Sequence, residues 1–95
     1  ALPISTHPIV VAEQHLDTNK HVNNAQYVLM AFDALAEAGI EAPLDTLSVQ
    51  YRDMAYLGDV IVPTIYECEN GKTVSLGDGN DAVYAIVRFQ ERNDQ

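Results

Sequence analysis

An acid, an amide and an imidazole stand at alternate positions in one short polar segment: Asp17, Asn19 and His21. In an extended segment, side chains two residues apart point to the same side, so these three are predicted to converge on one pocket. A carboxylate, an amide that does not titrate and an imidazole that titrates near neutrality form a workable set for hydrolysis. The same spacing fits an alternative equally well, a polar loop whose side chains cap a helix and satisfy backbone donors.

The segment after this polar motif is predicted to be a helix that positions it. Asn23 is the expected N-cap, with Gln26 completing a capping-box variant, and Gly39 falls where a left-handed C-terminal cap belongs. Apolar residues recur at helical spacing and predict the buried face. They are Val28, Ala31, Phe32, Leu35 and Ala38.

The rest of the chain has the pattern of strands. Apolar β-branched residues open a first strand before the polar motif, and a period of two begins after Pro43. The expected strands are 9–16, 47–52, 60–69, 73–76 and 82–90. Two of them are expected to bury one face, formed by Leu47, Val49 and Tyr51 in the first and by Val83, Ala85, Val87 and Phe89 in the second.

Local signals refine the strands and define the fold class. Pro63 within its strand predicts an edge or a bulge, and Asn70-Gly71 predicts a two-residue hairpin turn. The order of elements predicts an α+β fold, with one long helix packed on a curved antiparallel five-stranded sheet. Residues 1–8 contain prolines, Ser and Thr and predict a linker or lead-in, which leaves 9–95 as a single domain. So small a sheet has exposed edges, which favours pairing with a second such unit.

The composition narrows the possible partners. Fourteen acidic residues face five basic ones, a formal net charge of −9, which disfavours nucleic acid and anionic membrane surfaces. No apolar run reaches membrane-spanning length, and no signal peptide is recognisable. A lone Cys68 fits a reducing compartment, so a cytoplasmic protein is expected. The histidines have no recognised metal-ligand spacing, and neither a metal nor an organic cofactor is expected.

Two patches of this sequence resemble one enzyme family. The run Asp-x-Asn-x-His-Val-Asn-Asn-x-x-Tyr, from Asp17 to Tyr27, closely resembles the signature of acyl-ACP thioesterases, where it lies in the C-terminal of two hotdog halves. The patch Tyr51-Arg52-Asp53-Met54-Ala55, followed by Gly58-Asp59, is similar to the family's strand after the helix. The resemblance implies a hotdog fold and makes 9–95 the C-terminal half of a double-hotdog enzyme. Ala1 in place of Met fits such a fragment.

The resemblance also implies an activity in fatty acid biosynthesis. Water attacks an acyl thioester and releases a fatty acid from acyl carrier protein, in a pocket formed where two hotdog units meet. Asn19 and His21 position and polarise the reactants, and Asp17 supports or activates them. The residues implied in substrate binding are Asn23, Asn24, Tyr27 and Met54. The two asparagines are also the expected helix caps, and Met54 is expected to line an acyl-chain channel.

One departure from the family keeps two alternatives open. Plant members carry a glutamate three residues after the strand tyrosine, where this sequence has Met54, which cannot transfer a proton. Asp53 could replace the glutamate only if a bulge brought it to the same side. The alternatives are a homodimeric acyl-CoA thioesterase and an inactive hotdog module for binding or dimerisation. The acidic composition also repels acyl carrier protein, so basic residues of an N-terminal half would have to dock it.

Overall fold

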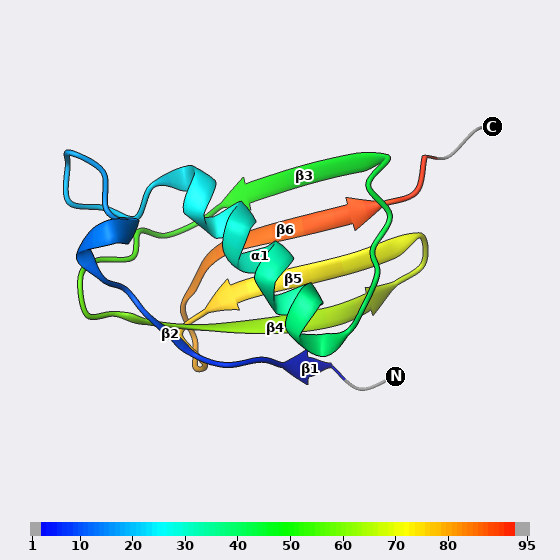
Figure 1. Cartoon of the computed structure of the whole chain (residues 1–95), viewed down its shortest axis with the longest axis horizontal. Coiled ribbons are helices and arrows are strands. Elements are labelled where there is room, and N and C mark those ends of the chain that lie inside the picture. The colour runs from blue at the N-terminus through cyan, green and yellow to red at the C-terminus, as the bar shows by residue number, and fades with distance from the viewer. Residues whose placement is uncertain (1–2, 93–95) are drawn as a thin grey trace.

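The computed structural model describes residues 3–92 and contains one long helix laid across an antiparallel sheet (Figure 1). The helix α1 spans Asn24–Ala38, and a short 3-10 helix, η1, spans Glu13–His15. The strands are β1 (Ile4–Ser5), β2 (Ile9–Val10), β3 (Thr46–Tyr51), β4 (Val60–Cys68), β5 (Gly71–Gly77) and β6 (Val83–Gln90). Their order in the six-stranded sheet is β1-β4-β5-β6-β3, and β2 also pairs with β4. The predicted α+β class is confirmed, with six strands instead of five.

Both ends of α1 are the predicted ones. The Asn23 side chain accepts a hydrogen bond from the Ala25 N–H, and Gly39 ends the helix in the left-handed region at φ 68°. The predicted capping box is wrong, because the Asn23 N–H donates to the His15 carbonyl at 2.9 Å and is not open to the Gln26 side chain. The helix start is therefore tied to η1, the element that precedes the polar motif.

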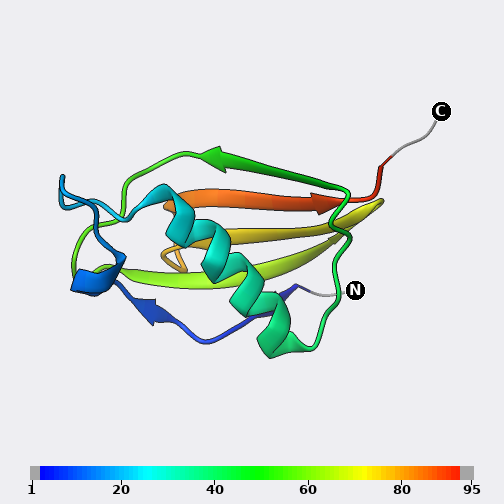
Figure 2. The same cartoon turned by 45° about the horizontal axis from the view of Figure 1, so that its top comes forward.

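The buried face of α1 is rotated from the predicted one. Ala31 and Leu35 are buried as expected, whereas Phe32 is 39% exposed. The buried residues of the helix are Tyr27, Met30, Ala31, Ala34 and Leu35. The rotation follows from the position of α1, which crosses β4, β5 and β6 diagonally and leaves β3 to one side (Figure 2). Phe32 lies at the edge of the contact between α1 and the sheet, where its ring meets that of Phe89 at a centroid distance of 5.2 Å.

The core lies between α1 and the central strands. The register aligns Ile65 of β4, Val74 of β5 and Val87 of β6 in one row across the sheet, and all three are buried. The predicted inner face of the last strand is confirmed at Ala85, Val87 and Phe89, which are fully buried, while Val83 is only partly so. This face gives α1 a continuous apolar surface to pack on.

The N-terminal segment differs from its prediction. The strand expected over 9–16 ends at Val10, because the chain turns into η1, where the His15 Nδ1 accepts a hydrogen bond from the Ala12 N–H at 2.9 Å. The expected lead-in contributes β1, which pairs with β4 through Ile4 and Ile65. Residues 1–2 of that lead-in lie outside the described residues.

Pro63 lies at neither an edge nor a bulge, so that prediction is wrong. The pairing of β4 with β5 is regular from Val62 to Cys68. The Pro63 carbonyl accepts a hydrogen bond from the Thr6 N–H at 3.0 Å. The carbonyl and nitrogen of a paired strand residue face the same neighbour, so the absent N–H of Pro63 faces the gap between β1 and β2 and breaks no bond to β5.

The predicted hairpin is present, with its turn one residue earlier. Cys68 pairs with Gly71, so the turn residues are Glu69 and Asn70. Gly71 already belongs to β5, and a Cβ at this position would lie 1.8 Å from the Phe89 carbonyl oxygen. Glycine is therefore needed at this position because β5 and β6 approach closely there, and not because a turn conformation requires it.

Strand β3 forms one end of the strand order, and of its predicted buried face only Val49 packs against the core, partly buried. Leu47 is 40% exposed and Tyr51 is 47% exposed, although both point to the same side as the buried residues of β6 that they pair with. Within residues 3–92, β3 pairs only with β6, and α1 does not extend over it. An apolar strip beside the helix is left uncovered.

Candidate active site

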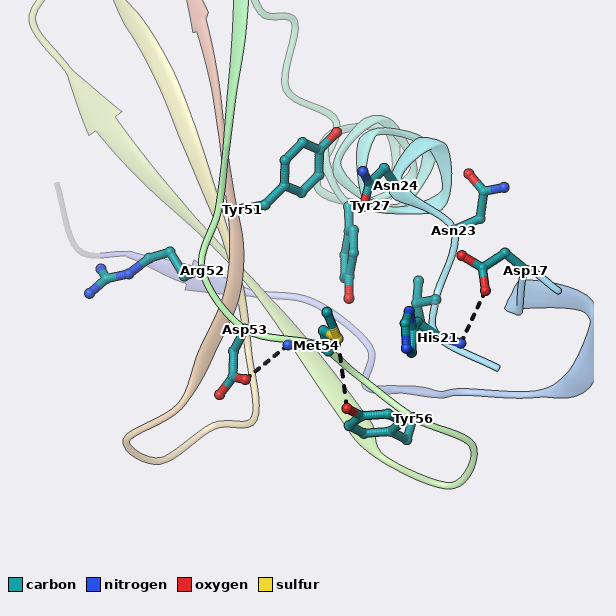
Figure 3. A pocket seen from close by; sticks show the side chains of 11 residues that line it. Asp17, His21, Asn23, Asn24, Tyr27, Tyr51, Arg52, Asp53, Met54 and Tyr56 are labelled. Carbon is teal, nitrogen blue, oxygen red and sulfur yellow. Dashed lines mark hydrogen bonds between the residues drawn. The ribbon is translucent and has the colours of Figure 1, made fainter. Parts of the chain in front are cut away.

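An open cavity of about 710 Å³ lies where the loop before α1, the first turn of α1 and the segment after β3 meet (Figure 3). It is lined by Asp17, His21, Val22, Asn23, Asn24, Tyr27, Tyr51, Arg52, Asp53, Met54 and Tyr56. Both sequence patches thus border one cavity, although they are distant along the chain. Six of the seven predicted site residues line it, and Asn19 does not.

The polar motif is a tight turn, so the prediction of an extended segment is wrong. The Asp17 N–H donates to the His21 carbonyl at 2.8 Å, and Leu16 and Val22 form an isolated bridge just outside the turn. Lys20 closes the turn with a left-handed φ of 69°. The Asn19 side chain is exposed on this turn, away from the residues that line the cavity.

The Asp17 carboxylate holds the turn together. Its Oδ1 accepts hydrogen bonds from the Asn19 N–H at 2.9 Å and the His21 N–H at 3.2 Å. This is the satisfied polar loop that the sequence left open as an alternative. Through these bonds Asp17 fixes the backbone that carries His21. Asp17 also lines the cavity, where it adds negative charge at the rim.

His21 presents a half-buried imidazole to the cavity. Its ring meets Tyr56 edge to face, with centroids 5.8 Å apart and planes at 84°. No hydrogen bond to this imidazole occurs within residues 3–92, so both ring nitrogens can meet a bound molecule. The ring contact leaves the imidazole oriented without using its hydrogen-bonding groups.

The N-terminus of α1 opens onto the same cavity. Asn23 uses its side chain as the helix cap, and Asn24 is the first helical residue. The N–H groups of a first helical turn lack partners within the helix and carry partial positive charge. The Ala25 N–H donates to the Asn23 side chain and the Gln26 N–H donates to the Asn23 carbonyl, so the Asn24 N–H is the donor that this end of α1 offers to an electron-rich atom in the cavity.

Tyr27 extends from α1 towards Met54 and is 3% exposed (Figure 3). Its hydroxyl oxygen accepts a hydrogen bond from the Ala55 N–H at 3.3 Å. Burial raises the pKa of Tyr27 above its ordinary value of 10.0, and the charge of Asp53 raises the pKa further. The hydroxyl therefore keeps its proton in the neutral pH range.

The segment after β3 contains the bulge that Asp53 would need. The N–H groups of Arg52 and Asp53 both donate to the Tyr84 carbonyl, at 2.9 and 3.2 Å, and two successive donors on one carbonyl are typical of a β-bulge. Asp53 and Met54 consequently both line the cavity. The Asp53 carboxylate accepts the Met54 N–H at 2.9 Å and points away from His21 in Figure 3.

Two aromatic residues of the cavity were not predicted as site residues. Tyr56 contacts His21 and donates a hydrogen bond to the Met54 sulfur at 3.7 Å. The Tyr51 ring lies 6.1 Å from that of Tyr27. The alternation of Met54 with Tyr56 was a signal for the first of them, because residues two apart share a side in extended backbone.

Nearly the whole sequence matches the model of one protein family. The family model for the acyl-ACP thioesterase C-terminal domain matches residues 4–91. The chain belongs to this family. The resemblance drawn from the two sequence patches is thereby confirmed. No sequence among the curated proteins matches the chain.

Similarity to solved structures identifies the fold. The 12:0-ACP thioesterase from Umbellularia californica superposes with a TM-score of 0.74 at 18% identity, covering 95% of this chain and 35% of that one. The SAV2348 protein from Staphylococcus aureus, solved in complex with CoA, gives 0.77 at 16% identity and covers 97% and 76%. The probable thioesterase YbaW from Escherichia coli gives 0.71 at 22% identity and covers 90% and 77%. This acyl-ACP thioesterase-family chain is a hotdog domain, as predicted.

One further finding concerns membranes. None of the helices within residues 3–92 is long and apolar enough to cross a bilayer.

Proposed function

We propose that this hotdog domain hydrolyses an acyl thioester carried by acyl carrier protein and releases a free fatty acid. The observation that carries the proposal is the cavity that joins the imidazole of His21 to the donor end of α1. Membership in a family described by acyl-ACP thioesterase activity supplies the substrate class.

The reaction needs a base and an anion-stabilising site, and the cavity has groups suited to both. His21 accepts a proton from water as the water oxygen forms a bond to the thioester carbonyl carbon. The carbonyl oxygen gains negative charge beside the first turn of α1, at Asn24. The C–S bond then breaks, the sulfur leaves with the proton held by His21, and the fatty acid remains. Asp17 is a positioning residue here, because it holds the N–H of His21.

The acyl chain has an apolar route along α1. A second cavity of about 360 Å³ lies near the end of the helix. It is lined by Phe32, Leu35, Ala36, Ile40, Glu41, Ala42 and Leu44. Tyr27 in the first cavity and Leu35 in the second are separated by about 12 Å along a helix that rises 1.5 Å per residue. We infer that the acyl chain runs from His21 towards Phe32 on the β3 side of α1.

The active unit contains a second hotdog unit against β3. Leu47 and Tyr51 of this edge strand are exposed, and so are Met54, Tyr56 and Leu57 just beyond it. An unpaired edge beside exposed apolar side chains is a surface that a partner strand covers. In the acyl-ACP thioesterase reading, residues 9–95 are the C-terminal half of a double-hotdog enzyme, and its other half supplies basic residues that dock the acidic carrier. Basic residues of the other half are needed because this chain, with a net charge of −9, repels an acidic carrier.

A homodimeric acyl-CoA thioesterase is the second candidate. It is favoured by the match to the SAV2348 structure in complex with CoA, which covers 97% of this chain. In that case the second unit is another copy of the same chain, paired through β3.

The test compares hydrolysis of acyl-ACP and acyl-CoA by the protein and by its His21→Ala variant. General acid–base catalysis contributes about 10²–10⁴-fold, so kcat/KM should fall by that factor. His7→Ala is the matched control, because His7 is an exposed histidine that pairs with Glu37 outside the cavity. Faster hydrolysis of acyl-CoA would favour the second candidate. Turnover that is unchanged in His21→Ala, or no turnover of either substrate by the folded protein together with its second hotdog unit, would refute the proposal.

A further inference from the structure

Tyr27 differs from the other tyrosines of the cavity in its burial. Tyr51 is 47% exposed and Tyr56 is 50% exposed, whereas Tyr27 is 3% exposed. Its ring is fixed at one end by α1 and at the other by the hydrogen bond from the Ala55 N–H. The hydroxyl therefore occupies one defined place at the inner end of the cavity.

The hydrogen bonds of this hydroxyl are incomplete. A tyrosine hydroxyl has one proton to donate and two lone pairs that accept. The Ala55 N–H occupies a lone pair, at 3.3 Å. No group within residues 3–92 accepts the proton of Tyr27. The proton of Tyr27 can therefore be donated to an oxygen atom of a molecule bound in the cavity.

The charge state suits a donor. Burial raises the pKa of Tyr27 most, the hydrogen bond from Ala55 lowers it by a smaller amount, and the nearby charges of Asp53 and Asp59 raise it further. The phenol is therefore protonated wherever the thioester is stable. It can give a hydrogen bond but does not act as a base.

We propose that the Tyr27 hydroxyl donates a hydrogen bond to the carbonyl oxygen of the bound thioester. This role rests on the proposed function and adds a side-chain donor to the backbone N–H of Asn24. As water adds to the carbonyl carbon, the oxygen becomes negative and the bond from Tyr27 strengthens, because a donor to a charged acceptor is about twice as strong as one to a neutral acceptor.

The test separates the carbonyl oxygen from the rest of the substrate. Two non-hydrolysable ligands are attached to acyl carrier protein: a ketone, with a methylene group in place of the thioester sulfur, and a thioether, with a methylene group in place of the carbonyl. Tyr27→Phe should weaken binding of the ketone about tenfold, the value of one hydrogen bond, and leave the thioether unchanged. It should also raise KM by about the same tenfold factor, because the neutral thioester carbonyl accepts the same hydrogen bond, and lower kcat about 10²-fold.

Tyr84→Phe is the matched control, because Tyr84 is 7% exposed and does not line the cavity. Replacing Tyr27 by 3-fluorotyrosine keeps the ring and makes the hydroxyl a stronger donor, so it should tighten the ketone alone; this measurement holds even if Tyr27→Phe is unstable. Equal weakening of both ligands, or no weakening of either, would overturn the role of Tyr27. Failure of the unmodified protein to bind either ligand would instead overturn the proposed function, and this role with it.

Discussion

Asp17 offers the sharpest test of how the polar motif works, because one oxygen of its carboxylate accepts two backbone hydrogen bonds. These come from the Asn19 N–H at 2.9 Å and the His21 N–H at 3.2 Å. The substitution Asp17→Asn keeps an oxygen acceptor at the same place and removes only the charge. The substitution Asp17→Ala removes the acceptor, which leaves the turn that carries His21 without its internal support.

The two variants are expected to differ in stability. A hydrogen bond to a charged group contributes about 1.5 kcal/mol at the lower end of its range, which suits a half-buried carboxylate, so Asp17→Ala should lose about 3 kcal/mol. A neutral bond contributes about 1 kcal/mol, so Asp17→Asn should lose about 1 kcal/mol in total. Urea denaturation measures both free energies of unfolding. Asp33→Asn is the control, because Asp33 is an exposed helical carboxylate outside the cavity.

Activity separates support of the turn from direct chemistry. If Asp17 acts by positioning His21, kcat/KM of Asp17→Asn should stay within about tenfold of the unmodified protein, while Asp17→Ala should approach the His21→Ala loss of about 10²-fold or more. A folded Asp17→Asn variant that is as inactive as Asp17→Ala would contradict this positioning role. That result would mean that the carboxylate charge itself acts on the water or on the imidazole.

Three further predictions concern stability. Asn23→Ala removes the N-cap of α1 and should cost about 1 kcal/mol, seen as a lower Tm; an unchanged Tm would contradict the capping role. Gly71→Ala should prevent folding or cost more than about 3 kcal/mol, because its Cβ would meet the Phe89 carbonyl at 1.8 Å, and a circular dichroism melt like that of the unmodified protein would disprove this. Burial raises the folded-state pKa values of Tyr27 and Tyr84 above 10.0, so their stabilisation is complete below pH 10.0 and is lost as the pH rises through the folded pKa values. Unfolding free energies measured up to pH 12 should fall less steeply in Tyr84→Phe, and an identical slope would rule out a contribution from that group.

Local signals in the sequence were sufficient for several elements of the fold. The ends of α1 at Asn23 and Gly39 follow from a side-chain cap and a left-handed glycine, both of which act within one helical turn. The hairpin at Asn70 and the inner face of β6 follow from turn chemistry and a period of two in the same way. The family also followed from a contiguous signature, because the order of residue types is a property of the chain itself.

Several predictions that depended on what a segment packs against failed. The expected face of α1 included Phe32, but the diagonal crossing of the sheet turned Tyr27 and Met30 inwards. Of the expected buried face of β3, Leu47 and Tyr51 are exposed and Val49 is only partly buried, because strand alternation specifies which residues share a side and not whether anything covers that side.

The amino-acid sequence by itself determined which groups are available for chemistry: His21, Asp17 and the capped start of α1, together with membership in the thioesterase family. Tertiary structure alone decided how those groups are used. In the folded chain the motif is a turn, and the Asp17 carboxylate accepts hydrogen bonds from backbone N–H groups of that turn. Asn19 lies outside the cavity, and the buried Tyr27 lines it. The physical reason is that a hydrogen bond such as the one from Ala55 to Tyr27 joins residues 28 positions apart, and only the packing of helix on sheet brings them together.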